Sequence, residues 1–251
     1  MMKKKKSSDV KKGDTSPFVQ QRQKVNFELN IQERSDLTER QNVILETMED
    51  KNTRCVFIDG FWGTSKSFLS ILASLRLLRD KKIDGIIYIR NPVEASKFGK
   101  VGILPGTVEE KMAPYMAILY DKLNEMLPKP EMDLLIKDKR IECLPVSFCQ
   151  GLSWNCKAII VDEAASMSYD DILLLLSRCG KYTKIFIIGD SANQNSIGNN
   201  SGFRKIFEIF NDTESMENGV FTFELRNKDD IVRSGFVKFV MNKVGILPND
   251  L

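Results

Sequence analysis

Histidine is absent from this 251-residue sequence, and its five cysteines form no Cys-x-x-Cys pair. A zinc site would need cysteine and carboxylate ligands alone, at spacings that do not suit tetrahedral coordination. We therefore predict no structural zinc. Most of the cysteines lie in apolar runs, which favours buried, reduced thiols in a cytoplasmic protein. They are Cys55, Cys143, Cys149, Cys156 and Cys179.

Long hydrophobic segments are also lacking. No apolar run approaches the roughly 20 residues that span a bilayer, and the N-terminus is too polar for a signal peptide. We therefore expect no membrane association. A composition with 42% hydrophobic and 28% charged residues is that of a globular protein. The length suffices for one large α/β domain with a sizeable core.

The net charge of +3 is unevenly distributed. Residues 1–12 hold six lysines and one acid, which leaves 31 basic and 33 acidic residues, or −2, in the remainder. Residues 1–30 have few apolar positions, so we expect a disordered basic arm there and a folded domain over 31–251. An electrostatic attraction to nucleic acid would depend on the arm and on local patches. The alternative for the arm is a solvated tail without a partner.

A phosphate-binding loop is the clearest signal in the chain. An apolar strand is predicted over residues 55–58, a glycine-containing loop follows, and an amphipathic helix is predicted over 66–78. Amides of such a loop and the helix N-terminus bind phosphates, a lysine reaches the outer phosphates, and a serine can ligate magnesium. The predicted nucleotide-binding residues are Gly60, Phe61, Trp62, Gly63, Thr64, Ser65, Lys66 and Ser67, with Lys66 catalytic and Ser67 a metal ligand.

Ser65 is the one departure from the pattern Gly-x-x-x-x-Gly-Lys-Ser, because it occupies the position of the second glycine. If the backbone there requires a positive φ, serine costs about 1–2 kcal/mol more than glycine. Such a cost weakens a phosphate site without abolishing it.

An acidic pair follows the apolar run 158–161. We predict a buried strand there, neighbouring the strand of the phosphate loop. At its carboxyl end Asp162 can hold magnesium, mostly through water. Glu163 can polarise an attacking water as general base. Acidic pairs on protein surfaces seldom follow a continuous buried strand, which favours a catalytic site.

Two further positions are candidates for nucleotide contacts. After the apolar run 184–189, Asp190, Asn193 and Gln194 can present a polar sensor to the γ-phosphate, and Gln194 is the candidate catalytic residue. Gln41, on a helix predicted over 36–48, can read the adenine edge, although a surface glutamine is the alternative.

Apolar strands alternating with helices predict a doubly wound, mostly parallel sheet flanked by helices, as in P-loop NTPases. Ligands then bind beyond the carboxyl ends of the strands. Further strands are predicted over 85–90, 141–146 and 220–225. Further helices are predicted over 107–127 with an interruption near Pro114, and over 132–137, 170–179, 203–210 and 229–244.

Asn227-Lys-Asp-Asp230 matches the guanine-reading pattern Asn-Lys-x-Asp. A GTPase also needs Asp-x-x-Gly at the magnesium strand, and Asp162-Glu-Ala-Ala165 has no glycine there. We therefore interpret residues 227–230 as a turn that caps the last helix.

Other motifs resemble the PhoH-like family over about residues 37–243. They are Arg90-Asn-Pro-Val-Glu94, Gly102-Ile-Leu-Pro-Gly106, Glu110-Lys111, Pro114-Tyr115, Ser177-Arg178-Cys-Gly180, Gly189-Asp190, Ser201-Gly202 and Asp230-Ile-Val-Arg233. The resemblance implies an ATPase core similar to superfamily-one helicases, with ATP and Mg²⁺ as cofactors. It implies coupling to RNA or other single-stranded nucleic acid and a homo-oligomeric ring, such as a hexamer. Arg233 matches a late arginine that would act as a finger on a neighbouring subunit's γ-phosphate.

Several positions depart from the family pattern. Besides Ser65, Ala165 replaces a glutamine after the acidic pair, Gln150 and Leu152 replace two arginines, and Asn193 stands where a glutamine is expected. These changes keep a second hypothesis open, a nucleotide-gated scaffold that hydrolyses little ATP. A small-molecule kinase fits less well because no arginine-rich lid is visible. Candidate nucleic-acid contacts are the lysine arm, Arg90, Lys97 and Lys100.

Overall fold

The computed structural model describes residues 29–90, 108–193 and 197–247. Six strands form one sheet in which every paired strand is parallel, in the order β3-β2-β4-β5-β1-β6. The strands are β1 (Cys55–Gly60), β2 (Gly85–Arg90), β3 (Ile141–Leu144), β4 (Lys157–Asp162), β5 (Lys184–Gly189) and β6 (Val220–Leu225). The predicted doubly wound α/β fold is confirmed.

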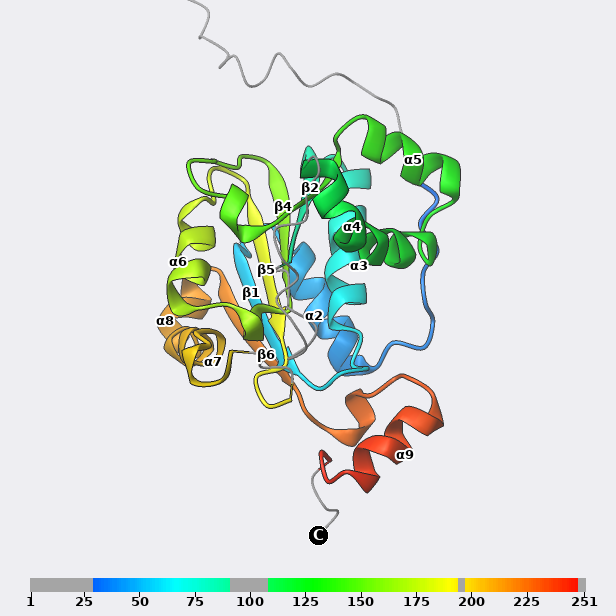
Figure 1. The fold of residues 1–251 in the computed structure, drawn as a ribbon, viewed down its shortest axis with the longest axis vertical. Helices are drawn as coiled ribbons and strands as arrows, with labels where there is room; N and C mark the ends of the chain where they lie inside the picture. Colours follow the sequence, from blue (N-terminus) through cyan, green and yellow to red (C-terminus); the bar gives the residue numbers. More distant parts are fainter. Residues whose placement is uncertain (1–28, 91–107, 194–196, 248–251) are drawn as a thin grey trace, which may run out of the picture.

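Helices cover both faces of the sheet (Figure 1). One layer holds α2 (Glu39–Glu49), α3 (Lys66–Arg79), α4 (Val108–Asn124) and α5 (Lys129–Lys137), and the other holds α6 (Tyr169–Ser177), α7 (Phe203–Ile209) and α8 (Thr213–Glu217). Alternate residues of β1 enter the two layers: Val56 and Ile58 pack under α3, whereas Phe57 packs with Phe203 and Phe207 of α7. This period of two is the pleat of a strand buried on both faces.

The last helix, α9 (Gly235–Lys243), lies away from both layers, near the carboxyl end of β6 (Figure 1). A small apolar cluster joins it to the phosphate loop, formed by Phe61, Ile231, Met241 and Leu247 with Trp62 at its margin. The predicted helix over 229–244 is wrong at its start. A short 3-10 turn spans Lys228–Asp230, and extended backbone precedes α9, because the Val232 N–H donates to the Gly63 carbonyl instead of to a helical one.

Other predicted elements differ as well: α4 ends at Asn124, α5 begins at Lys129, and α6 ends at Ser177. Helix α2 begins at Glu39, after its N-cap Thr38, and β3 ends at Leu144, before Pro145. Helix α4 runs without interruption through position 114. Its Leu119 and Leu123 enter the core, and this packing offsets the one hydrogen bond that a proline cannot donate.

One prediction about strand order is wrong. The strand of the acidic pair, β4, is not adjacent to β1, because β5 lies between them. Strand order depends on which faces of the elements pack together, so it is not encoded in any single segment. The carboxyl ends of β1, β5 and β4 nevertheless meet at one edge of the sheet.

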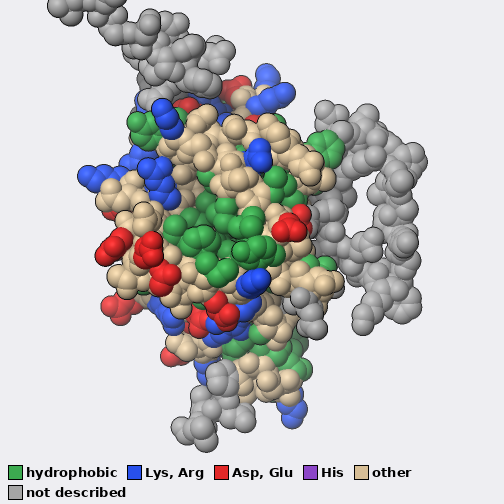
Figure 2. All heavy atoms as spheres, turned by 90° about the vertical axis from the view of Figure 1, so that its left-hand side faces the viewer, with side chains coloured by type: hydrophobic (Ala, Val, Ile, Leu, Met, Phe, Trp, Pro, Cys, Tyr) green, Lys and Arg blue, Asp and Glu red, His purple; other side chains and the backbone are tan. Residues whose placement is uncertain are grey.

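Apolar side chains also gather on the outer face that carries α6, α7 and α8 (Figure 2). Leu173 of α6, Ile209 of α7 and Met216 of α8 are exposed. Among the described helices, none combines the length and hydropathy that a membrane span requires.

Candidate nucleotide-binding site

The loop between β1 and α3 has the backbone of a phosphate cradle. Gly63 has a φ of +84°, and at Gly60 a β-carbon would lie 2.6 Å from the Leu225 carbonyl oxygen, so both positions require glycine. Ser65 has a φ of 64° and a ψ of 19°, in the left-handed region. The cost anticipated for serine at this position therefore applies, at about 1–2 kcal/mol.

Lys66 lies folded back across the loop. Its Nζ donates to the Gly60 carbonyl at 2.6 Å and to the Phe61 carbonyl at 2.7 Å. Burial lowers the pKa of Lys66, while Asp190 and Asp162 act in the opposite direction. The Lys66 ammonium thus lies near several carboxylates, and two carbonyl groups of the phosphate loop hold it in place.

Ser67 and Asp162 meet in space. The Ser67 hydroxyl is 3.3 Å from each carboxylate oxygen of Asp162. Asp162 is further held by the buried Tyr88 hydroxyl, which donates to one oxygen, and by the Glu163 N–H, which donates to the other at 2.9 Å. Tyr88 could not be recognised from the sequence as part of the site, because it falls in an otherwise apolar strand.

Glu163 is held beside this pair by an arginine from β2. The Arg90 Nη2 lies 3.3 Å from a Glu163 carboxylate oxygen, and its Nη1 lies 3.7 Å from Asp162. Burial, and then the Asp162 charge, raise the pKa of Glu163, whereas Arg90 and Lys66 lower it. A carboxylate with a raised pKa and a fixed orientation suits a general base.

Ser67 and Asp162 fit a magnesium ion, because hydroxyl and carboxylate oxygens are the hard ligands that it prefers. In the described part of the chain, no group of three or more His, Cys, Asp or Glu side chains is arranged to hold a metal. This donor set is typical of magnesium that takes its remaining ligands from phosphates and water.

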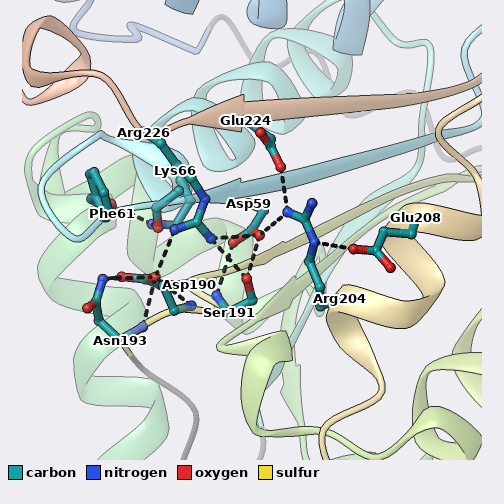
Figure 3. Close-up of polar contacts among 12 residues, drawn as sticks. Asp59, Phe61, Lys66, Asp190, Ser191, Asn193, Arg204, Glu208, Glu224 and Arg226 are labelled. Atoms are coloured by element: carbon teal, nitrogen blue, oxygen red, sulfur yellow. Dashed lines mark hydrogen bonds and ion pairs between the residues drawn. The ribbon is translucent and has the colours of Figure 1, made fainter. Parts of the chain in front are cut away.

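The turn after β5 is organised by its own aspartate. Asp190 is fully buried, and its carboxylate accepts the backbone N–H groups of Ala192 and Asn193 and the Asn193 amide (Figure 3). Asn193 therefore helps to hold the turn after β5 in its conformation. The predicted sensor Gln194 lies outside the described residues.

Next to the loop is an ion pair that sequence reasoning missed. The Arg226 Nη2 lies 2.8 Å from the fully buried Asp59 carboxylate and donates to the Ser191 hydroxyl at 2.9 Å (Figure 3). Its guanidinium also lies over the Phe61 ring, 5.4 Å from the centroid. The available signal was Asp59 itself, because an acid in an apolar strand requires a buried partner.

Gln41 is fully buried. Its side-chain nitrogen donates to the carbonyls of Thr64 and Asp230, both at 3.2 Å, and its oxygen accepts the Thr38 N–H. The side chain therefore ties α2 to the phosphate loop from behind. Its role as an adenine reader stays a prediction.

Arg233 lies against its own chain's loop. Its side-chain carbons come within 3.4 Å of the place where a β-carbon on Gly63 would stand. It lines the same cavity, of about 320 Å³, as Ser65, Lys66, Ser67, Asp162 and Glu163. Its role as a finger on a neighbouring subunit's γ-phosphate stays a prediction, and its position would also let it serve the site of its own chain.

Of the predicted nucleic-acid contacts, Arg90 is at the edge of the cavity, where it pairs with Glu163. Lys97, Lys100 and the lysine arm lie outside the described residues.

Comparison with known proteins assigns the chain to a family. Residues 34–244 match the family model described as PhoH-like protein. A PhoH-like protein of Mycobacterium tuberculosis (strain ATCC 25618 / H37Rv) is 32% identical over 168 residues, which are 66% of this chain and 47% of that protein. A PhoH-like protein of Bacillus subtilis (strain 168) is 32% identical over 140 residues, 56% of this chain and 43% of that protein.

Protein PhoH2 of Mycolicibacterium smegmatis (strain ATCC 700084 / mc(2)155) is 28% identical over 170 residues, 67% of this chain and 39% of that protein. The chain spans about half the length, or less, of these curated relatives. The family model, in contrast, matches most of the chain, including the phosphate loop, the acidic pair and Arg233. The chain therefore belongs to the PhoH-like family of P-loop ATPases.

Proposed function

We propose that this chain binds ATP with Mg²⁺ in the cavity beside the phosphate loop and hydrolyses it. The observation that carries the proposal is the contact of Ser67 with Asp162, which joins the loop after β1 to the acidic end of β4. Lys66 and Glu163 line the same cavity. The residues proposed as phosphate-binding lysine, magnesium ligands and general base thus line one cavity.

The loop would bind the phosphates through its amides and through Lys66. Two of the three N–H donors of Lys66 now bond to the Gly60 and Phe61 carbonyls, so a phosphate oxygen would take the third donor or displace one of these carbonyls. Ser67 and Asp162 would hold Mg²⁺, which supplies charge neutralisation at the outer phosphates when bound.

Glu163 would accept the proton of the attacking water. Arg90 keeps the Glu163 carboxylate oriented, and burial keeps its pKa above that of a free glutamate. Arg233 would stabilise charge on the γ-phosphate from within its own chain, because its side chain already lies against Gly63. Gln194 stays a proposed sensor, and Gln41 is proposed to contact the nucleotide or to support the loop that does.

Glu163→Gln tests the chemical step. We expect the variant to bind ATP with Mg²⁺ and to lose turnover by about 10²–10⁴-fold, the typical contribution of a general base. Glu217→Gln, an exposed change on α8, is the control and should keep full activity. Turnover of Glu163→Gln at the rate of the unmodified chain would contradict the assignment.

We further propose that residues 31–251 form the ATPase unit and that it acts on RNA or another single-stranded nucleic acid as a homo-oligomeric ring, such as a hexamer. The motifs that begin at Arg90 resemble those of PhoH-like proteins, whose ATPase core is similar to that of superfamily-one helicases, and this supports the coupling. Arg90 also contacts Glu163 directly. ATPase rates with RNA and DNA strands test it. Binding that does not weaken with salt would exclude a phosphate-led interaction. Light scattering with and without nucleotide measures the mass of the assembly and therefore the number of subunits in the proposed ring.

A nucleotide-gated scaffold is the second candidate. It is favoured by Ser65 in its strained conformation and by Lys66, two of whose three N–H donors already bond to loop carbonyls. Both features oppose tight phosphate binding. ATP-dependent assembly without phosphate release, with or without RNA, would support the scaffold over the hydrolase.

A further inference from the structure

The cavity has two sides built from different parts of the fold. Its sheet side is formed where strands end, by Arg90, Asp162, Glu163 and Gly189. Its helix side is formed by Phe68 in the first turn of α3, by the segment before α2, and by the end of α4, and it includes Arg34, Lys122 and Glu125. The phosphate chemistry occupies the sheet side, so the rest of a nucleotide has to extend along the helix side.

Arg34 is held flat on the helix side. Its Nε and Nη2 donate to the two carboxylate oxygens of Asp36, at 2.8 and 2.6 Å. Its guanidinium carbon lies over the Phe68 ring, 5.2 Å from the centroid. The two bonds fix the plane of the guanidinium, and Phe68 covers one of its faces.

The segment that carries Arg34 is anchored on both sides. Asn30 bonds to Glu131 of α5 at 2.7 and 2.9 Å, and the Gln32 N–H donates to the Met126 carbonyl at 2.8 Å. Glu33 forms an ion pair with Arg76 of α3 at 2.9 Å. Arg34 is therefore presented to the cavity by a fixed backbone.

We propose that Arg34 is the stacking platform for the nucleobase, an inference that rests on the proposed nucleotide binding. A guanidinium plane stacks on any base through its π face. Its charge is already balanced by Asp36 in a bidentate pair, which leaves it better suited to stacking than to binding phosphate.

The order of contacts along the loop agrees with this placement. Loop amides bind the inner phosphates, and Lys66 and Ser67 serve the outer phosphates and magnesium. Phe68 follows Ser67 directly, and the Arg34 plane lies on Phe68. A nucleoside that leaves the phosphates on the helix side thus reaches Arg34 first.

Calorimetric titration with two ligands tests the platform. The ligands are an ATP analogue with a non-hydrolysable β,γ-imido bridge and inorganic tripolyphosphate, both with Mg²⁺. We expect Arg34→Ala to bind the ATP analogue roughly tenfold more weakly, the loss of one stacking contact, and to bind tripolyphosphate unchanged. Arg34→Lys should show the same loss, because a lysine keeps the charge without the plane.

Arg79→Ala is the matched control. Arg79 also pairs with the acid that follows it, Asp80, at 3.0 Å, but it lies at the far end of α3 and does not line the cavity. Its other ion pair, with Glu33, is long at 4.0 Å, and Arg76 still holds Glu33 at 2.9 Å when Arg79 is removed. Arg79→Ala should leave the affinities for both ligands unchanged. The Tm of each Arg34 variant should differ from that of the unmodified chain by no more than the Tm of Arg79→Ala does.

Equal weakening of both ligands by Arg34→Ala, or rescue by Arg34→Lys, would assign Arg34 to phosphate binding and overturn the platform. Unchanged affinity for the ATP analogue would overturn it as well. If the unmodified chain binds the analogue and tripolyphosphate equally tightly, the base makes no contact and the inference fails while the proposed phosphate site stands. If it binds neither, the proposed function fails.

Discussion

The Ser67 hydroxyl lies 3.3 Å from both carboxylate oxygens of Asp162, although 95 positions separate the two residues in the chain. Ser67 belongs to the first turn of α3, which follows β1, and Asp162 ends β4. Strand β5 lies between β1 and β4 in the sheet. A hydroxyl and a carboxylate this close, at the carboxyl edge of a parallel sheet, support the proposed magnesium site.

Asp162→Asn should weaken the binding of magnesium at the proposed nucleotide site. The amide keeps the shape of the side chain but loses the charge, so we expect the magnesium concentration for half-maximal turnover to rise by at least about tenfold. A magnesium titration of ATPase activity measures it. Asp133→Asn, on an exposed position of α5, is the control. An unchanged magnesium requirement would show that Asp162 does not hold the ion.

Ser65→Gly should relieve backbone strain. Glycine adopts a φ of 64° freely, so we expect about 1 kcal/mol of added stability and a Tm increase of about 2–4 °C. Nucleotide affinity should also rise, because glycine removes a side chain that lines the cavity and takes room near the phosphates. Differential scanning calorimetry and nucleotide titration measure the two effects.

Lys139→Gly separates the two effects of that change. Lys139 also has a positive φ, of 53°, but it follows α5 and does not line the cavity. It should add similar stability without changing affinity. Equal affinity gains in both variants would refute a local effect of Ser65.

Arg226→Met should be strongly destabilising. It removes the principal cation from Asp59, which is fully buried, and the remaining partner Arg204 is 43% exposed. Burial alone would raise the pKa of Asp59, but the hydrogen bonds from Arg226 and Ser191 outweigh it and lower the pKa. We expect a loss of about 3 kcal/mol in the free energy of unfolding.

Arg204→Met is the comparison for that ion pair, and we expect it to cost below about 1 kcal/mol, as for other exposed pairs. The double variant Asp59→Asn with Arg226→Met should regain part of the stability lost by Arg226→Met alone. Denaturant unfolding at pH 7 measures all of them. Equal costs for the two single arginine variants would contradict the ranking.

Lys184 should make stability rise with pH above neutrality. Burial lowers the pKa of Lys184 to about 8, where its Nζ donates to the Thr53 carbonyl at 2.7 Å. The unfolded chain, with a lysine pKa of about 10.4, binds more protons between these values, so unfolding becomes less favourable as pH rises through this window.

Lys184→Met should remove this contribution. The difference in unfolding free energy between the unmodified chain and Lys184→Met, followed from pH 7.5 to 10, isolates it from cysteine and tyrosine titration. A difference that stays constant over this range would show that the lysine pKa is not lowered.

Much of the fold was predictable because it is encoded locally. The runs 85–90 and 184–189 are strands with the predicted boundaries, since largely apolar residues bounded by polar turns have few other ways to be buried. The run 220–225, which alternates apolar and polar residues, is a partly buried strand at the edge of the sheet. The phosphate loop was recognisable because its glycines, lysine and serine must stand at fixed spacing. The predicted helix over 229–244 failed because a tertiary hydrogen bond, from Val232 to Gly63, outweighed local helix propensity.

The sequence by itself determined the strands, the loop, the acidic pair and the family. Only the tertiary structure decided that β5 lies between β1 and β4, that Arg233 lies on its own chain's loop, that Gln41 is buried behind it, and that Asp59 pairs with Arg226. The physical reason is range. Periodicity and turn chemistry act over a few residues, whereas strand order and buried ion pairs depend on which distant faces pack together once the core forms.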